Sequence, residues 1–79
     1  MMQLTLYTKE SCSLCDKLKS QLETHQERFP HQLREVDITQ DDVLFEKYRF
    51  TIPVLQSGDS KIEAPIDEQK LEAFLEGLA

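Results

Sequence analysis

The sequence predicts an α/β fold in which the elements follow as strand, helix, strand, helix, strand, strand, helix. Three observations carry this prediction. An alternating apolar run at Leu4 and Leu6 gives way to leucines spaced by four, which is the change from strand to helix periodicity. A Gly-Asp turn separates two later short apolar runs, and an amphipathic run ends the chain. The first strand–helix–strand unit implies a right-handed parallel crossover. We therefore expect a four-stranded mixed sheet flanked by three helices.

The first half of the chain supplies two strands and the first helix. The first strand is predicted at Gln3–Tyr7, where apolar and polar residues alternate. A helix follows from about Cys12 or Ser13 to about Gln26, with a predicted buried stripe of Leu14, Leu18 and Leu22. Pro30 ends this segment, because a residue before proline disfavours the helical conformation. The second strand is predicted at Gln32–Ile38.

The second half supplies a short helix, a hairpin and a last helix. Thr39 is the predicted cap of a helix at about Asp41–Tyr48, since acids follow it in the first turn. Pro53 cannot donate to a strand ladder, so the hairpin strands are predicted after it, at Val54–Gln56 and Lys61–Ala64. Asp67 is the predicted cap of the last helix, whose buried stripe is Leu71, Phe74, Leu75 and Leu78; Ile66 and Leu71 are spaced as a hydrophobic staple.

Size and charge limit the classes of function. The 79 residues are expected to form a single domain spanning 1–79, and the expected state is a monomer. A net charge of −6 argues against nucleic acid and anionic membrane surfaces as partners, since both are bound through Lys and Arg. No basic segment followed by a long apolar run opens the chain, and no apolar run approaches a membrane span. With two cysteines at redox spacing, a cytoplasmic location is expected.

The chain's only cysteines, Cys12 and Cys15, stand where a strand gives way to a helix. A C-x-x-C motif in that context indicates thiol–disulfide chemistry. The N–H groups and dipole at a helix start favour a thiolate, so the pKa of Cys12 is expected to fall from about 8.5 into the range of about 3.5–7.5. Cys15 lies about one turn further on, close enough to attack a mixed disulfide. Cys12 is therefore the predicted nucleophile and Cys15 the predicted resolving thiol.

Three other interpretations of the cysteines stay open: a structural disulfide, half of a metal site, or two core residues. A two-residue loop is a poor staple, because disulfides stabilise mainly by closing long loops. A structural zinc site usually has four protein ligands, and besides the two cysteines only His25 and His31 are available as the usual nitrogen donors. Both histidines are predicted to lie at the surface without a catalytic role. No metal is expected.

The chain resembles glutaredoxins and the wider thioredoxin superfamily over essentially its whole length, and most of all the small glutaredoxin-like proteins with a C-x-x-C site. The segment Tyr7–Cys15 is similar to the glutaredoxin active-site segment, with Lys9 three residues before the nucleophile. The segment Thr51–Val54 resembles the superfamily's cis-proline segment, and the order of elements matches a thioredoxin-like fold. The resemblance implies a cis peptide bond at Pro53, which would lie against Cys12.

The resemblance also implies a substrate site around the cysteines. The backbone of Ile52 would pair with an extended substrate, as a strand added to an edge. Lys9 could meet a glutathione carboxylate, although a solvated loop lysine is an equally good interpretation, and Arg49 is a weaker candidate for an anion. The expected substrate-binding residues are Lys9, Ser11, Ser13, Leu14, Ile52, Pro53 and Asp67.

Two departures from the glutaredoxin pattern bear on the substrate. Ser13-Leu14 stands where glutaredoxins usually carry Pro-Tyr, so the reduction potential is bounded only by the class range of about −120 to −270 mV. The segment Glu63–Glu68 replaces a Gly-Gly pair whose lack of side chains allows close backbone approach. Asp67 and Glu68 lie near the acidic end of that motif, where helix capping is the simpler role. We therefore expect a preference for protein or peptide disulfides over glutathione.

The sequence leaves three candidate functions for this chain. The first is a dithiol–disulfide oxidoreductase that reduces protein or glutathione mixed disulfides, with no cofactor beyond a reductant such as glutathione or a thioredoxin-reductase-type enzyme. The second is a non-catalytic binding module that docks a partner at the Ile52-Pro53 face. The third is a pair of chains that share a metal cluster through Cys12 thiolates. In the resembling family this third function depends on bound glutathione, so the missing glycines weigh against it.

Overall fold

All predicted elements are present in the computed structural model, which describes residues 1–79. Their ends lie within two residues of the predicted ones, and a short 3₁₀ turn, η1, is added before α2. The elements are β1 (Met2–Thr8), α1 (Ser13–Thr24), β2 (His31–Asp37), η1 (Ile38–Gln40), α2 (Asp42–Tyr48), β3 (Val54–Ser57), β4 (Ser60–Glu63) and α3 (Glu68–Leu78). None of the helices is both long and apolar enough to cross a membrane.

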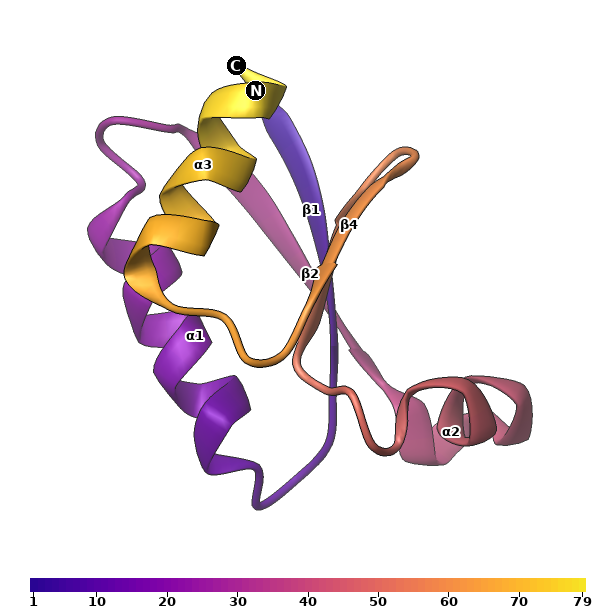
Figure 1. Ribbon diagram of the computed structural model, residues 1–79. Coiled ribbons are helices and arrows are strands. Elements are labelled where there is room, and N and C mark those ends of the chain that lie inside the picture. The colour runs from indigo at the N-terminus through magenta and orange to yellow at the C-terminus, as the bar shows by residue number, and fades with distance from the viewer.

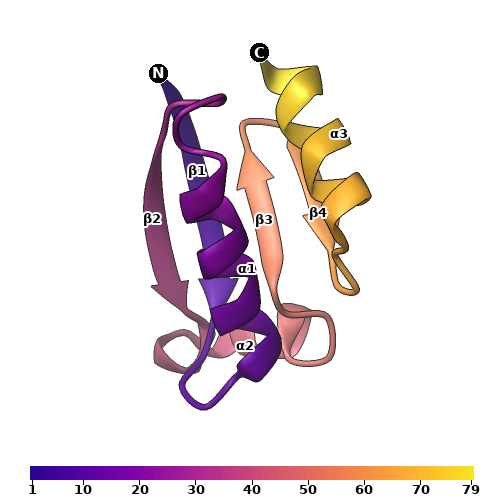
Figure 2. The same ribbon diagram turned by 90° about the vertical axis from the view of Figure 1, so that its left-hand side faces the viewer.

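The sheet is mixed and has the strand order β2-β1-β3-β4. β1 and β2 are parallel, with Leu4 opposite Leu33, while β3 pairs antiparallel with both β1 and β4. Figure 1 shows α1 and α3 together on one face of the sheet and α2 at one end on the other side. In Figure 2, α1 crosses in front of β1, and α3 lies beside it over the β3–β4 side. The predicted four-stranded mixed sheet with three helices is confirmed.

The main core lies between the sheet and the pair α1 and α3. Alternate residues of β1 point into it, so Leu4 and Leu6 are buried while Thr5 faces the other side. The cluster comprises Leu4, Leu6, Leu18, Leu22, Phe29, Leu55, Leu71 and Leu75. Each fully buried leucine stabilises the fold by about 1.5–3 kcal/mol relative to an exposed one. This core fixes α1, and therefore its N-terminal end, against the strands.

The predicted cap at Thr39 is wrong. Asp41 caps α2, because its carboxylate accepts hydrogen bonds from the Val43 N–H (2.9 Å) and the Leu44 N–H (3.2 Å). Thr39 instead lies inside η1 and donates its hydroxyl (2.6 Å) and its N–H (2.9 Å) to Asp37. The Thr39 hydroxyl, followed by the Thr39 N–H, lowers the pKa of Asp37. Two consecutive carboxylate caps therefore replace the single threonine cap.

The structure also corrects the predicted burial of Leu14. It is 56% exposed, whereas Leu18 and Leu22 are buried as expected. Leu14 lies in the first turn of α1, and the inward position of that turn is taken by the fully buried Cys15. The four-residue spacing holds for the later leucines but does not apply to the first turn.

The surface prediction for His25 and His31 is wrong as well. His31 is 4% exposed, its Nδ1 lies 2.7 Å from the Phe29 carbonyl, and its backbone N–H donates to the Gln26 side chain at 3.1 Å. The His25 side chain is largely buried and pairs with Glu68 at the start of α3. Because both rings have partners within the fold, they serve packing and helix contacts.

Candidate functional site

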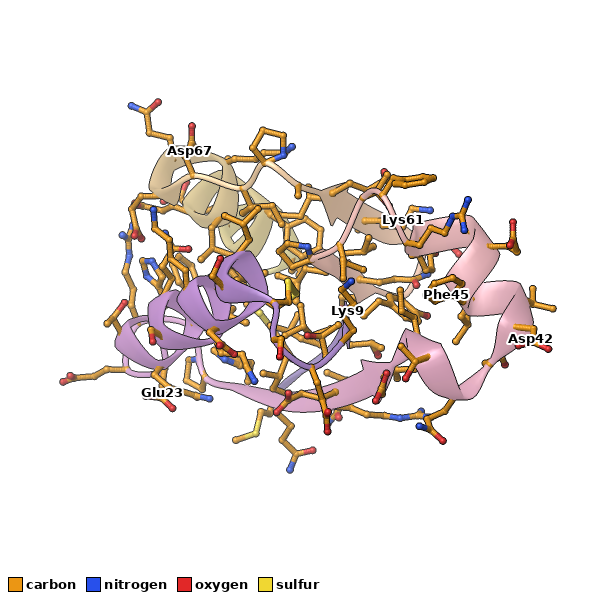
Figure 3. All side chains as sticks on the ribbon, turned by 90° about the horizontal axis from the view of Figure 1, so that it is seen from below. Lys9, Glu23, Asp42, Phe45, Lys61 and Asp67 are labelled. Atoms are coloured by element: carbon orange, nitrogen blue, oxygen red, sulfur yellow. A yellow bond between two sulfur atoms is a disulfide. The ribbon has the colours of Figure 1, made fainter.

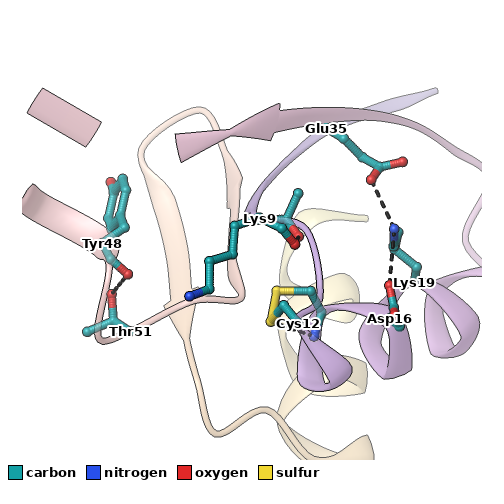
Figure 4. The surroundings of a disulfide bond; sticks show 9 residues. Lys9, Cys12, Asp16, Lys19, Glu35, Tyr48 and Thr51 are labelled. Carbon is teal, nitrogen blue, oxygen red and sulfur yellow. Dashed lines mark hydrogen bonds and ion pairs between the residues drawn. A yellow bond between two sulfur atoms is a disulfide. The ribbon is translucent and has the colours of Figure 1, made fainter. Parts of the chain in front are cut away.

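Cys12 and Cys15 form a disulfide at the start of α1, with their Cα atoms 5.2 Å apart. Cys12 is the N-cap residue of the helix and has extended backbone angles. Its Sγ accepts a hydrogen bond from the Cys15 N–H at 3.2 Å, and its carbonyl accepts from the Asp16 N–H at 3.1 Å. Figure 4 shows the disulfide at the point where the loop from β1 enters the helix. The sulfur of Cys12 therefore occupies the place where a cap oxygen usually meets the free N–H groups of a helix.

The two sulfurs differ in their access to solvent. Cys15 is fully buried, in a second apolar cluster with Ile38, Tyr48, Ile52 and Val54. Cys12 is partly exposed and packs against the edge of that cluster. A disulfide substrate can therefore approach Cys12 but not Cys15. No group of three or more His, Cys, Asp or Glu side chains is placed to hold a metal ion.

Ser11 gives the loop before Cys12 its shape. It has a φ of +58°, the left-handed region that serine rarely adopts. This conformation costs a residue with a Cβ about 1–2 kcal/mol. It lets the chain turn sharply between the end of β1 and the cap position of Cys12.

The Ile52-Pro53 peptide bond is cis, as the resemblance implied, and both residues are buried. Ile52 belongs to the same cluster as the cysteine pair, so the fold brings these residues together. The Ile52 N–H already donates to the Tyr48 carbonyl at 3.1 Å. The Ile52 carbonyl has no backbone partner, so it is the group that can accept from a substrate N–H.

A groove of about 190 Å³ opens beside the cysteines, between α1 and the segment before α3. We call it the Leu14 groove. Its polar residues are Lys17, Gln21 and Asp67, and the others are apolar. It is lined by Leu14, Lys17, Leu18, Gln21, Pro53, Ala64, Pro65, Ile66 and Asp67. The exposed Leu14 side chain and the cis proline thus form two sides of one recess.

A second pocket, of about 250 Å³, lies on the other side of the active-site loop and has no hydrophobic lining. Lys19 lies between the carboxylates of Glu35 (3.2 Å) and Asp16 (3.4 Å), as Figure 4 shows. The hydrogen bond to Glu35, together with its charge, raises the pKa of Lys19. The lining residues are Thr8, Lys9, Glu10, Ser11, Asp16, Lys19, Glu35 and Asp37.

The residues predicted to bind substrate are therefore divided between the polar pocket and the Leu14 groove. Lys9 and Ser11 line the polar pocket, whereas Leu14, Pro53 and Asp67 line the Leu14 groove. Ser13 and Ile52 line neither, although both lie next to residues that do. Sequence reasoning did not identify Lys17 and Gln21 as groove residues. They follow Leu14 by three and seven positions, so helical spacing places all three on one face.

The wall of the groove before α3 is held by hydrogen bonds. The Asp67 carboxylate caps α3 by accepting from the Lys70 N–H at 2.8 Å. The Lys70 ammonium donates to the carbonyls of Glu63 (2.8 Å) and Pro65 (3.1 Å). The Ala64 N–H donates to the Thr51 carbonyl at 3.1 Å, and Pro65, which also follows a cis bond, has no N–H. Neither Ala64 nor Pro65 therefore has an N–H to offer a ligand.

The other end of the groove is closed by a contact between α1 and α3. Glu68, the first residue of α3, pairs with His25 and accepts from the Gln21 amide at 3.2 Å. The hydrogen bond from His25 lowers the pKa of the Glu68 carboxyl, and the one from Gln21 adds to the effect. Because the folded-state pKa lies below the unfolded value of about 4.3, this carboxylate stabilises the fold above that pH. The stabilisation is lost as the pH falls through the folded-state pKa.

We expect His25→Ala to raise the pKa of Glu68 toward its ordinary value, because the main donor to the carboxylate is lost. A carboxyl-carbon nuclear magnetic resonance titration of both proteins measures this. The pKa of Asp37, which Thr39 lowers, should stay unchanged and serves as the internal control. A Glu68 titration that is identical in the two proteins would show that His25 does not hold this carboxylate.

Comparison with known protein families agrees with this geometry. Residues 3–76 match the model of a family described as a glutaredoxin-like domain, DUF836. A crystal structure of the structural-genomics target XcR50 from X. campestris is 32% identical, with a TM-score of 0.80, covering 94% of this chain and 96% of that one. Protein Ne2328 from Nitrosomonas europaea is 24% identical, with a TM-score of 0.78, covering 92% and 89% of the two chains.

A more distant neighbour extends the likeness of the fold. The glutaredoxin-like protein NrdH-redoxin from Escherichia coli is 19% identical, with a TM-score of 0.65, covering 90% of this chain and 93% of that one. NrdH-redoxin is described as having a thioredoxin-like activity profile. At this identity the likeness shows the thioredoxin-like fold alone.

Proposed function

The chain belongs to the glutaredoxin-like domain family, and on that basis we propose that it is a dithiol–disulfide oxidoreductase acting on protein or peptide disulfides. The fold and the Cys12–Cys15 pair support a redox function in general. One observation carries the finer proposal, namely that the two sulfurs have different environments. Cys12 caps a helix and is partly exposed, whereas Cys15 is fully buried beneath it. This arrangement suits an attacking thiolate and a resolving thiol.

The proposed reaction moves two electrons from the cysteines to the substrate. The Cys12 thiolate attacks one sulfur of the substrate disulfide, a new S–S bond forms, and the other substrate sulfur leaves as a thiolate that takes a proton from water. Cys15 then gives up its proton and attacks Cys12 Sγ, which forms the Cys12–Cys15 bond and breaks the mixed disulfide. The second substrate sulfur leaves as a thiolate and takes up a proton. The chain is left with the Cys12–Cys15 disulfide seen here.

A cellular dithiol or thiol reductant must then reduce this disulfide before the next turnover. Glutathione and a thioredoxin-reductase-type enzyme are the two classes of reductant that fit. This chemistry requires no bound cofactor, and a reducing compartment such as the cytoplasm would supply the reductant.

The Leu14 groove supports a preference for peptides over glutathione. A charged glutathione end is best held by free backbone N–H groups, and neither Ala64 nor Pro65 offers one. A lost hydrogen bond to a charged group costs about 1.5–3 kcal/mol, or about ten- to a hundredfold in affinity. The apolar sides of the groove and the free Ile52 carbonyl suit an extended peptide with an apolar side chain beside its cysteine.

The test compares turnover on a peptide disulfide with turnover on a glutathione mixed disulfide, with each class of reductant supplied in turn. We expect kcat/KM for the peptide to be higher by about tenfold or more. Pro65→Gly restores an N–H and removes the ring, so it should lower the ratio of kcat/KM for the peptide to kcat/KM for the glutathione disulfide. Ala73→Gly, on the exposed face of α3, is the control for adding a glycine. Submillimolar glutathione binding at Lys9, Ile52 and Asp67 would contradict the preference. Peptide binding without turnover would favour the alternative, a binding module at Ile52-Pro53.

A further inference from the structure

The cations of this acidic chain are paired unevenly. Nine lysines and arginines stand against fifteen acids. Lys19 on α1 and Arg28 just after it meet carboxylates, and Arg28 lies 2.7 Å from Glu72 and 2.8 Å from Glu76. Lys47 and Arg49, at the end of α2 and directly after it, form no ion pair. Lys17 on α1 and Lys70 on α3 are also without an ion pair. The positive charge near α2 is therefore available to a partner.

Two further lysines join this region. Lys9, in the loop before Cys12, has no ion pair, and Lys61 on β4 reaches Glu63 only at 3.9 Å. Figure 4 shows the Lys9 side chain extending from beside Cys12 toward the turn that carries Tyr48 and Thr51. Figure 3, the view of this end of the molecule, shows Phe45 and Lys61 on the α2 side and Lys9 between them and α1. We call Lys9, Lys47, Arg49 and Lys61 the cationic surface.

Aromatic rings hold three of these cations in place. Lys47 and Lys61 lie over the ring of Tyr48, 5.2 Å and 5.3 Å from its centroid. The Arg49 guanidinium lies 4.5 Å from the Phe50 ring centroid and 5.7 Å from that of Phe45. Such contacts stabilise exposed cations by about 0.5–1 kcal/mol each. The cations are thus positioned in advance, which lowers the entropy cost of binding an anion.

This surface is continuous with the redox site. Tyr48 lies in the cluster that buries Cys15, and its ring packs at a tilt against the Tyr7 ring, with the two centroids 4.7 Å apart. Arg49 and Phe50 directly precede Thr51, Ile52 and Pro53, and the Ile52 N–H is bonded back to Tyr48. A peptide that passes the free carbonyl of Ile52 would therefore run next to Arg49.

Two exposed apolar side chains accompany the positive charge. Phe50 is 84% exposed, and Val43, on α2, is 74% exposed. The carboxylates of Glu10 and Glu46 are the nearest along the chain to Lys9 and Lys47, and both are exposed. An anionic segment with an apolar residue matches this combination better than a purely ionic ligand does.

We infer that the cationic surface and Phe50 form a docking surface for an acidic peptide segment next to the substrate's reactive cysteine. This deepens the proposed function and rests on it for the identity of the occupant. The acidic charges of the segment would lie on Lys47 and Arg49 while its cysteine reaches Cys12. We expect this surface to orient the substrate as it approaches and to speed its association, more than to tighten its binding.

The binding test uses the oxidised wild-type protein and two short peptides with a blocked cysteine. One peptide carries glutamates and a leucine beside the cysteine, and the other carries lysines in place of the glutamates. Amide shifts should move saturably at Lys9, Lys47, Arg49 and Phe50 with the acidic peptide only. The shifts should vanish in 1 M salt, where the Debye length falls to about 3 Å.

Arg49→Glu should weaken binding of the acidic peptide about five- to tenfold, since an attraction becomes a repulsion. Arg34→Glu is the matched control, because Arg34 is also exposed and unpaired but contacts no aromatic ring. It should weaken binding less than about twofold. Equal effects of the two variants, or equal binding of the two peptides, would overturn the docking surface. Equal competition by an oligonucleotide of the same charge would also overturn it.

A second readout separates this inference from the proposed function. Disulfide forms of the two peptides are supplied as substrates, and kcat/KM should be higher for the acidic one in the wild-type protein but not in Arg49→Glu. Equal turnover of both peptides would contradict the docking surface and would still support the proposed oxidoreductase function. If neither peptide is turned over while the acidic one binds at Arg49, the proposed function fails and the docking surface stands.

Discussion

Cys12→Ser is expected to lose disulfide turnover down to the uncatalysed background, whereas Cys15→Ser should stall after one attack. Cys12 caps α1 and is the only cysteine sulfur that a substrate can reach, so no other thiol can begin the exchange. Cys15 is fully buried directly beneath it, and its loss leaves the mixed disulfide without a resolving thiol. Mass spectrometry of Cys15→Ser after incubation with a peptide disulfide should show one peptide added per chain.

Ser20→Ala, on the exposed side of α1, is the control and should keep the wild-type rate. The opposite pattern, with the trapped peptide on Cys12→Ser, would reverse the roles of the two cysteines. Equal residual turnover in both single variants would show that neither cysteine carries the reaction.

Leu55→Ala should cost about 2–5 kcal/mol of the free energy of unfolding. Leu55 is fully buried in β3, between β1 and β4, and belongs to the main core. The free energy of unfolding of a small domain is only about 5–15 kcal/mol in total, so this substitution removes a large share of it. Urea denaturation measures the loss as a lower midpoint at an unchanged slope.

Leu14→Ala is the matched control for that substitution, since Leu14 is 56% exposed. It should cost less than about 1 kcal/mol, because little apolar surface leaves the core. A comparable loss from both variants would contradict the exposed position of Leu14. It would also restore the leucine stripe that the sequence pattern predicted.

Periodicity and turn chemistry were enough to predict the order and type of the strands and α-helices, but not the short η1 turn. Strand alternation at Leu4 and Leu6 and the later leucines of α1 reflect burial against a single core, so local pattern and tertiary structure agree. The prediction was wrong at the start of α2, where the cap is Asp41 and Thr39 lies inside the preceding η1 turn. A carboxylate can accept from several donors, as Asp41 does from the Val43 and Leu44 N–H groups.

The candidate site also has features that the sequence could predict and features that it could not. The two cysteines could be recognised from spacing and from the strand-to-helix change, which are local in the sequence. The groove could not be predicted, because Leu14, Pro53 and Pro65 meet only through the packing of α1 against the segment before α3. The burial of His31 depends on a carbonyl and an amide that the chain brings to it, so no local signal distinguishes it from a surface histidine.

The most direct test of the central claim is the alkylation rate of each cysteine in the reduced protein as a function of pH. The claim is that the start of α1 activates Cys12, while the buried Cys15 is shielded from reagents in solution and reacts only with Cys12. Cys12 should react at a pH well below the ordinary thiol range near 8.5, and Cys15 should react more slowly at every pH. The early phase should disappear in Cys12→Ser and persist in Cys15→Ser. A faster reaction at Cys15, or a single ordinary titration shared by both, would contradict the account.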